Sequence, residues 1–172
     1  MSVTTPRIRP FSADDLDALG AINDGAYPAV PITGREELAA LAELASPRLV
    51  VDDGTPAGFL FALPPGCDYD SENYRWFSER AAETGRSFLY VDRIVLAPRL
   101  QGQGVGPLLY AAVFDAAREG GHAEVLCEVN VQPPNPGSLA FHDRLGFREV
   151  GRQQTKGGSV EVALLAAEVP GQ

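Results

Sequence analysis

The most regular part of the sequence is a strand, a helix and a second strand between residues 88 and 131. Residues 88–96 form an apolar run of strand length, residues 107–119 carry apolar side chains at helical spacing, and residues 123–131 form a second strand-like run. This succession predicts two parallel strands that are joined by a right-handed crossover. The chain is therefore expected to fold around a sheet that contains a parallel pair.

Strands and helices also alternate in the rest of the chain. Ser12, which is followed by acidic residues, is typical of a helix N-cap, and Gly25 is typical of a helix end. We expect further strands at residues 7–9, 48–51, 57–62, 148–155 and 160–166, and further helices at residues 12–25, 35–45 and 135–145. The predicted class is α/β or α+β, with one mixed sheet flanked by helices. Because 172 residues fit one domain, we expect residues 1–172 to form a single one.

The composition excludes several classes of protein. Hydrophobic residues make up 45% and charged residues 22% of the chain, as in an ordinary globular protein. No apolar run approaches the roughly 20 residues of a membrane-spanning helix. Residues 1–10 have no continuous apolar stretch, so we expect no secretory signal there. A net charge of −9 disfavours non-specific binding to nucleic acid and is compatible with a cationic substrate such as an amine. We therefore expect a soluble cytoplasmic protein that binds neither nucleic acid nor membranes.

Cysteine and histidine are too few and too scattered to form a closed metal site. Cys67 and Cys127 lie far apart in the sequence, and His122 and His142 would need help from distant residues. We expect both thiols to be free in a reducing compartment, and no bound metal.

Residues 101–106, Gln-Gly-Gln-Gly-Val-Gly, connect the first strand of the regular unit to its helix. Their glycines permit backbone torsions and close approaches that side chains would prevent. Pro107 suits the first turn of a helix, where free N–H groups and the positive end of the dipole attract an anion. No Lys-Ser/Thr pair follows, so the segment is not a P-loop, and its spacing does not match a dinucleotide fingerprint. Taken alone, the segment is either an anion site or a tight turn without a ligand.

Residues 66–87 combine aromatic and polar side chains. A long insertion of this kind is often a lid or a binding loop, and the alternative is a surface helix whose rings pack on the sheet. Aromatic rings with few cations favour a small or amphipathic amine over a nucleic acid as the ligand. The candidates for contact with such an amine, inside this segment and elsewhere in the chain, are Tyr27, Tyr69, Tyr74, Trp76, Phe77 and Tyr90.

The sequence resembles the GNAT acyltransferases in two motifs that occur in the right order. Gln101, Gly104 and Gly106 fill the signature Q/R-x-x-G-x-G/A, and residues 94–98 match the strand end that usually precedes it. Residues 135–147 resemble the pattern N-x-x-A/S-x-x-L/F-Y-x-x-x-G-F. The chain also resembles a branch of predicted GNAT proteins of undefined substrate, which share a Tyr-Val-Asp-Arg strand and a Pro-Pro-Asn-Pro turn.

The resemblance implies a twisted mixed sheet that is splayed between the fourth and fifth strands. The pantetheine arm of coenzyme A would lie in this opening and pair with backbone of the strand end, and the pyrophosphate would rest on the amides of residues 101–106. Asn135 often contacts the pantetheine arm in the family, and before Pro136 it is also typical of an N-cap. The residues expected to bind acetyl-CoA or coenzyme A are Ile94, Val95, Leu96, Gln101, Gly102, Gln103, Gly104, Val105, Gly106 and Asn135.

Transfer of an acyl group to an amine requires a base for the ammonium proton, donors for the oxyanion and an acid for the thiolate. In the family the amine commonly attacks directly. Glu128 is the first candidate for the base, because it points away from the apolar face formed by its neighbours. Its segment is similar to the Leu-Glu-Val-Arg strand of ribosomal-protein N-terminal acetyltransferases, in which the glutamate is a proposed base. The alternative is a surface glutamate on a half-exposed strand.

Asp92 and His142 are the other catalytic candidates. Asp92 lies in an apolar strand and could accept the proton, bind the cation of the substrate, or form an ion pair with Arg93 or another arginine. His142 stands where the family usually has a tyrosine, the proposed acid for the thiolate. An imidazolium could take this role near neutral pH, and the alternative is a solvated helix residue.

These features predict an N-acyltransferase that moves an acetyl group from acetyl-CoA to a primary amine, with a small molecule as the expected acceptor. One alternative on the same fold is a non-catalytic acyl-CoA-binding or sensory module, which the histidine at position 142 keeps open. Another is a protein N-terminal or lysine acetyltransferase. A nucleotide-binding or purely structural domain lacks a phosphate-coordinating lysine or a metal motif to support it. Homodimers are frequent among such enzymes.

Overall fold

The computed structural model describes residues 4–171, which form two compact units. The first unit contains the residues up to Leu63 together with Asp92–Ala112, and the second contains Pro64–Val91 and the residues from Val113 onward. Strand β4 (Phe88–Leu96) and helix α4 (Val105–Glu119) run through both units. The hydrogen-bonded strand order is β1-β2-β3-β4-β5-β7-β6 in a seven-stranded sheet. A single domain over residues 1–172 stays a prediction.

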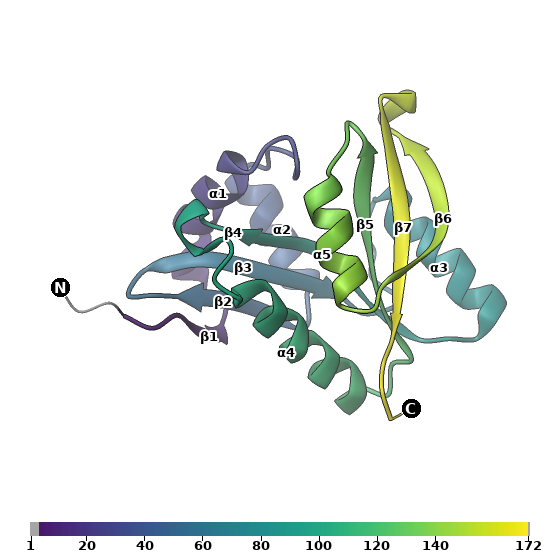
Figure 1. Ribbon diagram of the computed structural model, residues 1–172, viewed down its shortest axis with the longest axis horizontal. Coiled ribbons are helices and arrows are strands. Elements are labelled where there is room, and N and C mark those ends of the chain that lie inside the picture. Colours follow the sequence, from purple (N-terminus) through teal and green to yellow (C-terminus); the bar gives the residue numbers. More distant parts are fainter. Residues whose placement is uncertain (1–3, 172) are drawn as a thin grey trace. The chain divides into compact units, whose positions relative to one another are not determined.

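The first unit begins with three antiparallel strands, β1 (Arg7–Pro10), β2 (Arg48–Asp52) and β3 (Pro56–Leu63), which lie side by side (Figure 1). Strand β3 is buried from its second residue to its end. A strand that is covered on both faces has a continuous apolar sequence rather than an alternating one. The run Ala-Gly-Phe-Leu-Phe-Ala-Leu in β3 has this character.

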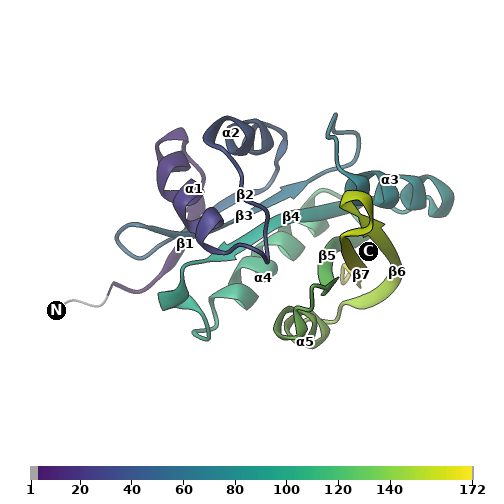
Figure 2. The same cartoon turned by 90° about the horizontal axis from the view of Figure 1, so that it is seen from above.

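Helices α1 (Leu16–Gly25) and α2 (Arg35–Leu44) cover one face of these strands (Figure 2). Both bury apolar residues at helical spacing, with Leu19 and Leu38 fully buried. Helix α1 follows a short 3₁₀ turn, Ala13–Asp15, in which Ser12 and Asp15 form a capping box. The prediction that Ser12 is an N-cap is therefore confirmed.

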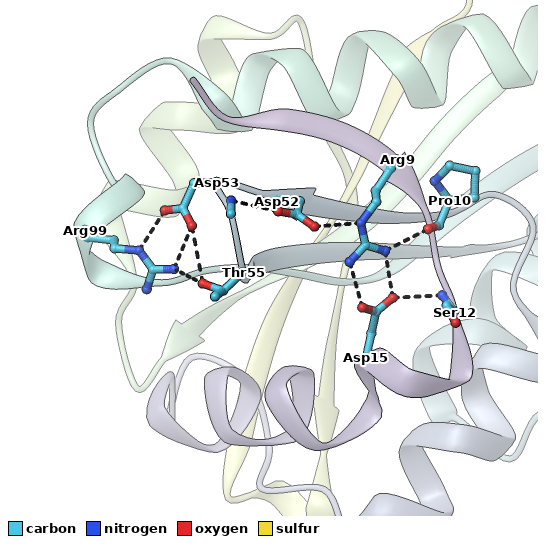
Figure 3. A network of polar contacts seen from close by, with 9 residues as sticks. Arg9, Pro10, Ser12, Asp15, Asp52, Asp53, Thr55 and Arg99 are labelled. Carbon is cyan, nitrogen blue, oxygen red and sulfur yellow. Dashed lines mark hydrogen bonds and ion pairs between the residues drawn. The ribbon is translucent and has the colours of Figure 1, made fainter. Parts of the chain in front are cut away.

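Arg9 connects β1 to β2 and to the start of the helical segment through two carboxylates (Figure 3). Its Nε donates to Oδ2 of Asp52 over 2.8 Å, and its Nη2 donates to Oδ1 of Asp15 over 2.7 Å. Asp15 also accepts the backbone N–H of Ser12 over 2.8 Å. These bonds favour the ionised carboxylates, so the Arg9 guanidinium holds the pKa of Asp15 and of Asp52 below its usual range.

The second unit contains β5 (Glu124–Gln132), β6 (Arg148–Thr155) and β7 (Val160–Glu168), with β7 antiparallel to both neighbours. The beginning of β4 pairs with the beginning of β5 in parallel, so that Phe88 lies opposite Glu124 and Tyr90 lies opposite Leu126. The predicted parallel pair is therefore confirmed. The opening of the sheet beyond these residues stays a prediction.

Helices α3 (Glu72–Thr84) and α5 (Pro136–Arg144) lie on opposite faces of the strands in the second unit (Figure 2). Helix α3 occupies the segment for which a lid and a surface helix were the alternatives, and the structure shows the helix. Ser71 caps its start by accepting the N–H of Tyr74, and Gly85 ends it in the left-handed conformation with φ 70°. Its buried residues, Tyr74 and Phe77, are aromatic.

Helix α1 begins at Leu16 instead of residue 12, because the 3₁₀ turn precedes it, and the ends of the other predicted elements lie within two residues of the observed ends. Helix α4 begins at Val105 instead of Pro107, so the proline occupies its third position. A proline is tolerated there because the first N–H groups of a helix have no acceptor within the helix. In the part of the chain that the structure describes, no helix is both long enough and apolar enough to span a membrane.

Candidate functional site

The glycine-rich loop lies in the first unit, between the end of β4 and the start of α4. A 3₁₀ turn, Pro98–Leu100, leads from the strand into the loop. Gly102 and Gly104 have φ angles of 74° and 76°, which side chains other than glycine rarely adopt. A Cβ atom placed on either glycine would meet no heavy atom within 4 Å. The backbone of the loop is therefore approachable from outside, next to a helix N-terminus that favours an anion.

Three side chains hold the loop and the turn before it. Nε2 of Gln103 donates to the carbonyl oxygen of Arg99 over 2.6 Å, and Nε2 of Gln101 lies 3.5 Å from the carbonyl oxygen of Leu96. The guanidinium of Arg99 donates from Nε to Oδ2 of Asp53 over 2.8 Å, as Figure 3 shows. These contacts connect the loop to the β2–β3 turn and restrict its conformation before any ligand binds.

Another glycine, Gly58, permits the close approach of β3 to the end of β4. A Cβ atom on Gly58 would lie 2.8 Å from the carbonyl oxygen of Val95 and 2.8 Å from a methyl carbon of Leu96. Just beyond them, the N–H of Ala97 donates to the carbonyl oxygen of Ala57 over 2.8 Å. Any larger residue at position 58 would therefore displace the strand end that was predicted to bind the pantetheine arm.

Asp92 lies at the start of the first unit's part of β4 and forms an ion pair with its neighbour. Nε of Arg93 is 3.2 Å from Oδ2 of Asp92, and both side chains are buried. Arg93 also donates from Nη1 to Oδ1 of Asn23 and to Oγ1 of Thr33, both over 2.9 Å. An ion pair with Arg93 was one of the alternatives for Asp92. The arginine connects the candidate carboxylate to the two ends of the α1–α2 connection.

Among the described residues of this unit, the two most exposed large apolar side chains are Tyr27 and Ile32 of the α1–α2 connection, at 63% and 65% exposure. Its ends are fixed by Asn23, which donates to the carbonyl oxygen of Pro31 over 2.9 Å, and by Thr33, whose N–H donates to Asp24 over 3.0 Å. The connection is therefore anchored at its base while its tip is accessible. Tyr27, a candidate for contact with an acceptor, lies on the accessible part.

In the second unit, the hydroxyl of Tyr90 donates a hydrogen bond to Oε2 of Glu128 over 2.6 Å. Tyr90 is fully buried, and Glu128 is half-buried on β5. The ring of Tyr90 lies against the rings of Tyr74 and Phe77, with centroid distances of 5.7 Å and 5.6 Å. Two of the sequence-predicted site residues, one named as a base and one as an acceptor contact, are thus in direct contact.

The other aromatic candidates of the second unit pack on the sheet or on each other. The hydroxyl of Tyr74 donates to the carbonyl oxygen of Pro64 over 2.7 Å and accepts the N–H of Cys67 over 3.0 Å. Burial raises the pKa of this hydroxyl. Tyr69 lies edge-on to Tyr74 with centroids 5.8 Å apart. Trp76 lies over β6, where a Cβ atom on Gly151 would come within 2.5 Å of its ring.

His142 is buried in α5 with an exposure of 4%. Its Nδ1 is 2.7 Å from the carbonyl oxygen of Ser138, and because that oxygen only accepts, Nδ1 carries the proton of the neutral ring. Its ring lies edge-on to those of Phe141 and Phe147, at 5.1 Å and 5.2 Å. Burial lowers the pKa of His142, and the bond to Ser138 offsets part of this. At neutral pH Nε2 is therefore an acceptor, and only the imidazolium could donate from it.

The start and end of α5 follow the predicted caps. Oδ1 of Asn135 accepts the N–H of Ser138 over 3.3 Å, which confirms the N-cap with Pro136 after it. Gly146 follows the last turn with φ 91°, as expected of a residue just beyond a helix end. Among residues 4–171 there is no group of His, Cys, Asp and Glu side chains that could hold a metal ion, and both cysteines are free thiols.

The contacts of Arg93 with Asn23 and Thr33, and that of Arg99 with Asp53, were not predicted from the sequence. A signal existed for Arg93, since an arginine inside the apolar run of β4 must find buried acceptors. No local pattern in the sequence indicates the pairing of Arg99 with Asp53, because the two residues are 46 positions apart.

Comparison with known proteins identifies the family. Residues 17–147 match the Acetyltransferase (GNAT) family. The phosphinothricin N-acetyltransferase of Streptomyces coelicolor is 40% identical over 65 residues, which cover 37% of this chain and 36% of that protein. The mycothiol acetyltransferase of Clavibacter sepedonicus is 30% identical over 139 residues, which cover 81% of this chain and 41% of that protein. The chain thus matches less than half the length of either relative.

A solved structure has the same fold. The structure of yncA from Salmonella typhimurium, with its cofactor acetyl-CoA, matches with a TM-score of 0.70 and 20% identity over 98% of this chain and 96% of that chain. The parallel β4–β5 pair and the glycine-rich loop before α4 agree with the family that the sequence motifs indicated. The match covers most of the chain, and we conclude that the protein belongs to the GNAT family of acetyltransferases.

Proposed function

We propose that the protein is an acetyl-CoA-dependent N-acetyltransferase that acts on the primary amine of a small molecule. The observation that carries the proposal is the loop of residues 101–106, with two left-handed glycines and open space beside them, at the start of α4. A pyrophosphate fits this loop, because successive backbone N–H groups and the helix dipole all favour an anion. In this proposal Ile94 and Leu96 pair through their backbone with the pantetheine arm.

The chemical step is direct attack by the amine on the thioester carbonyl carbon. The C–N bond forms, the C–S bond breaks, the ammonium proton goes to a base, and the departing thiolate takes up a proton. We assign the base to Glu128 rather than to Asp92. Asp92 is in contact with the permanent cation of Arg93, whereas Glu128 accepts a hydrogen bond from the neutral hydroxyl of Tyr90. A carboxylate beside a fixed cation is a weaker base.

The group that protonates the departing thiolate can be identified by experiment. His142 could protonate the thiolate only as an imidazolium, because its neutral form carries the proton on Nδ1. Burial lowers its pKa, so this form is scarce above the ordinary histidine range. If His142 is the acid, kcat rises as the pH falls below about 6.5, and His142→Phe removes that rise.

A small amine as acceptor is supported by two observations. The chain carries a net charge of −9, which favours a cationic substrate. The two curated relatives are named for phosphinothricin and for mycothiol, which are small molecules.

The first experiment is calorimetric titration with acetyl-CoA, coenzyme A and ATP. We expect acetyl-CoA and coenzyme A to bind more tightly than ATP, and Gly104→Glu to abolish binding through backbone strain and added charge. Gly66→Glu is the matched control, since Gly66 also has a positive φ and open surroundings but lies outside the loop. A folded wild-type protein that fails to bind coenzyme A would exclude the proposal.

Turnover is then measured as release of the coenzyme A thiol with a panel of primary amines and peptides. Release with small amines supports the proposed acceptor class, whereas release with peptides alone would replace it with a protein N-terminus or lysine. Binding without release from any acceptor would favour a non-catalytic acyl-CoA-binding module.

A further inference from the structure

The contact between Tyr90 and Glu128 lies at a defined place in the second unit. The backbone ladder of β4 and β5 pairs Tyr90 with Leu126, and Glu128 lies two residues further along β5. Alternation along a strand puts Leu126 and Glu128 on the same face. The side chain of Tyr90 therefore reaches diagonally from β4 to β5. Strand β4 was predicted to bind acetyl-CoA, and Glu128 on β5 was predicted to act as the base.

The tyrosine is held rigidly. It is 0% exposed, and its ring lies against those of Tyr74 and Phe77 from helix α3. Tyr74 is itself fixed by hydrogen bonds to the carbonyl oxygen of Pro64 and the N–H of Cys67. A phenol that is confined in this way presents its hydroxyl proton in one direction, and that direction leads to Oε2 of Glu128.

The hydrogen bond is short, at 2.6 Å between the two oxygens, which is typical of a hydroxyl that donates to an ionised carboxylate. Such a bond restricts the rotation of the glutamate side chain and favours its ionised form. The next carboxylate on the same face of β5 is Glu124, which is buried and bound to Arg80 over 2.6 Å. Glu124 is therefore bound to an arginine, whereas Glu128 accepts the hydrogen bond from Tyr90.

We infer that Tyr90 is the positioning residue of the catalytic base: its hydroxyl holds Oε2 of Glu128 and directs Oε1 toward the ammonium proton of the acceptor. Tyr90 does not take part in proton transfer. The ammonium proton moves to Oε1, and the hydroxyl proton stays on the tyrosine throughout. This inference rests on the proposed function, because it assumes that Glu128 receives a proton from an amine.

The kinetic test compares Tyr90→Phe, Glu128→Gln and the double variant. Loss of a general base lowers kcat by about 10²–10⁴-fold, and we expect that range for Glu128→Gln. For Tyr90→Phe we expect a smaller loss of kcat, an unchanged KM for acetyl-CoA, and an acidic limb of the pH profile that moves to higher pH. The double variant is expected to equal Glu128→Gln, because a positioning residue acts only through the residue that it positions.

Tyr110→Phe is the matched control, since Tyr110 is also a fully buried tyrosine but lies on α4. We expect it to keep the wild-type kcat and pH profile. A Tyr90→Phe variant with the wild-type pH profile would overturn the inference. So would a double variant in which the two losses multiply, since that result indicates independent structural effects.

A second measurement does not need turnover. In protein labelled with ¹³C in the glutamate side chains, the Glu128 carboxyl is identified by the signal that is missing in Glu128→Gln. Its titration midpoint is expected to move to higher pH in Tyr90→Phe and to stay in place in Tyr110→Phe. An unmoved midpoint in Tyr90→Phe would contradict the inference. Failure of the proposed function is a separate result, because it shows as a lack of coenzyme A binding by the wild-type protein.

Discussion

Nε of Arg99 lies 2.8 Å from Oδ2 of Asp53 (Figure 3), and the backbone carbonyl of the same arginine accepts a hydrogen bond from the side chain of Gln103. One residue thus joins the β2–β3 turn to the glycine-rich loop. Thr55 adds a weaker contact to the guanidinium at 3.4 Å. Because the loop is rich in glycine, it would lose much conformational entropy when it binds an anion, and these contacts remove part of that loss in advance.

Replacing Asp53 with asparagine is therefore expected to weaken acetyl-CoA binding. The ion pair with Arg99 is exposed, and pairs of this kind contribute little each, so we expect the Kd to rise by about two- to fivefold. Calorimetric titration measures the change. Asp70→Asn is the control, because Asp70 also forms an exposed pair with an arginine, Arg75, outside the loop. A Kd that is the same in Asp53→Asn and in wild type would show that the contact does not restrain the loop.

Replacing Arg93 with methionine is expected to destabilise the protein by about 3–5 kcal/mol, because it removes one partner of a buried ion pair. It also leaves Asn23 and Thr33, which are 0% and 3% exposed, without the donor that they share. Urea denaturation measures the free energy of unfolding.

Arg35→Met is the control for this variant. Arg35 pairs with Asp17 on the surface of α1 and α2, so its loss is expected to cost less than about 1 kcal/mol. Equal destabilisation by the two substitutions would contradict the anchoring role of Arg93. Arg93→Lys keeps the charge without the planar fork and is expected to lie between wild type and Arg93→Met.

Acid is expected to destabilise the protein through Glu124. Burial alone would raise its pKa, but the hydrogen bonds from Arg80 and the charges of Arg86 and Arg148 outweigh burial and hold the pKa below its usual value. A carboxyl with a lowered pKa in the folded state contributes stability above its unfolded pKa, near 4.5, and loses it as the pH falls toward the folded value.

We therefore expect Glu124→Gln to lower the free energy of unfolding by about 3 kcal/mol at pH 7, and by less at pH 4. Denaturant titrations at the two pH values measure the difference. Glu149→Gln, which removes an exposed i,i+3 pair with Arg152, is the control and is expected to have little effect at either pH. A loss for Glu124→Gln that does not depend on pH would contradict the assignment.

His142 is expected to make the folded state less stable as the pH falls below the ordinary histidine range. Burial lowers its pKa, so the unfolded chain takes up a proton near pH 6.5 while the folded protein stays neutral at this position. Stability is thus fully present above about pH 6.5 and declines below it, by at most about 1.4 kcal/mol per pH unit.

His142→Phe keeps an aromatic ring in contact with Phe141 and Phe147 and removes the titration. We expect the free energy of unfolding of the wild type to fall relative to this variant between pH 7.5 and pH 5.5. Thermal unfolding of both proteins across this range measures the effect. A constant difference would show that the pKa of His142 is not lowered in the folded state.

Local patterns in the sequence predicted the parallel pair, the caps of α5 and the glycine-rich loop. These features depend on neighbours in the chain: Asn135 caps N–H groups a few residues away, and Gly146 adopts a backbone conformation that its own lack of a side chain permits. The sequence also pointed to Glu128 and Tyr90 as site residues. It did not predict that they are hydrogen-bonded to each other.

Segment 66–87 shows where local patterns stop being sufficient. Its aromatic residues suit a mobile lid and a packed helix equally well, since both need large side chains on one face. The choice depends on partners that are distant in sequence, such as Gly151, which leaves room for Trp76, and Tyr90, which lies against Tyr74 and Phe77. The tertiary structure decides in favour of the helix because only there can these rings be buried.

The sequence by itself thus determined the family, the order of the elements and the loop that is proposed to hold the pyrophosphate, because each is encoded in residues close together in the chain. Only the tertiary structure decided which polar side chains meet. Arg93 donates a hydrogen bond to Asn23, Arg99 to Asp53, and Tyr90 to Glu128, and the paired residues are 38 to 70 positions apart in the sequence. A hydrogen bond is lost when its donor–acceptor distance grows by about 1 Å. Only strand pairing and helix packing together fix side-chain positions with this accuracy.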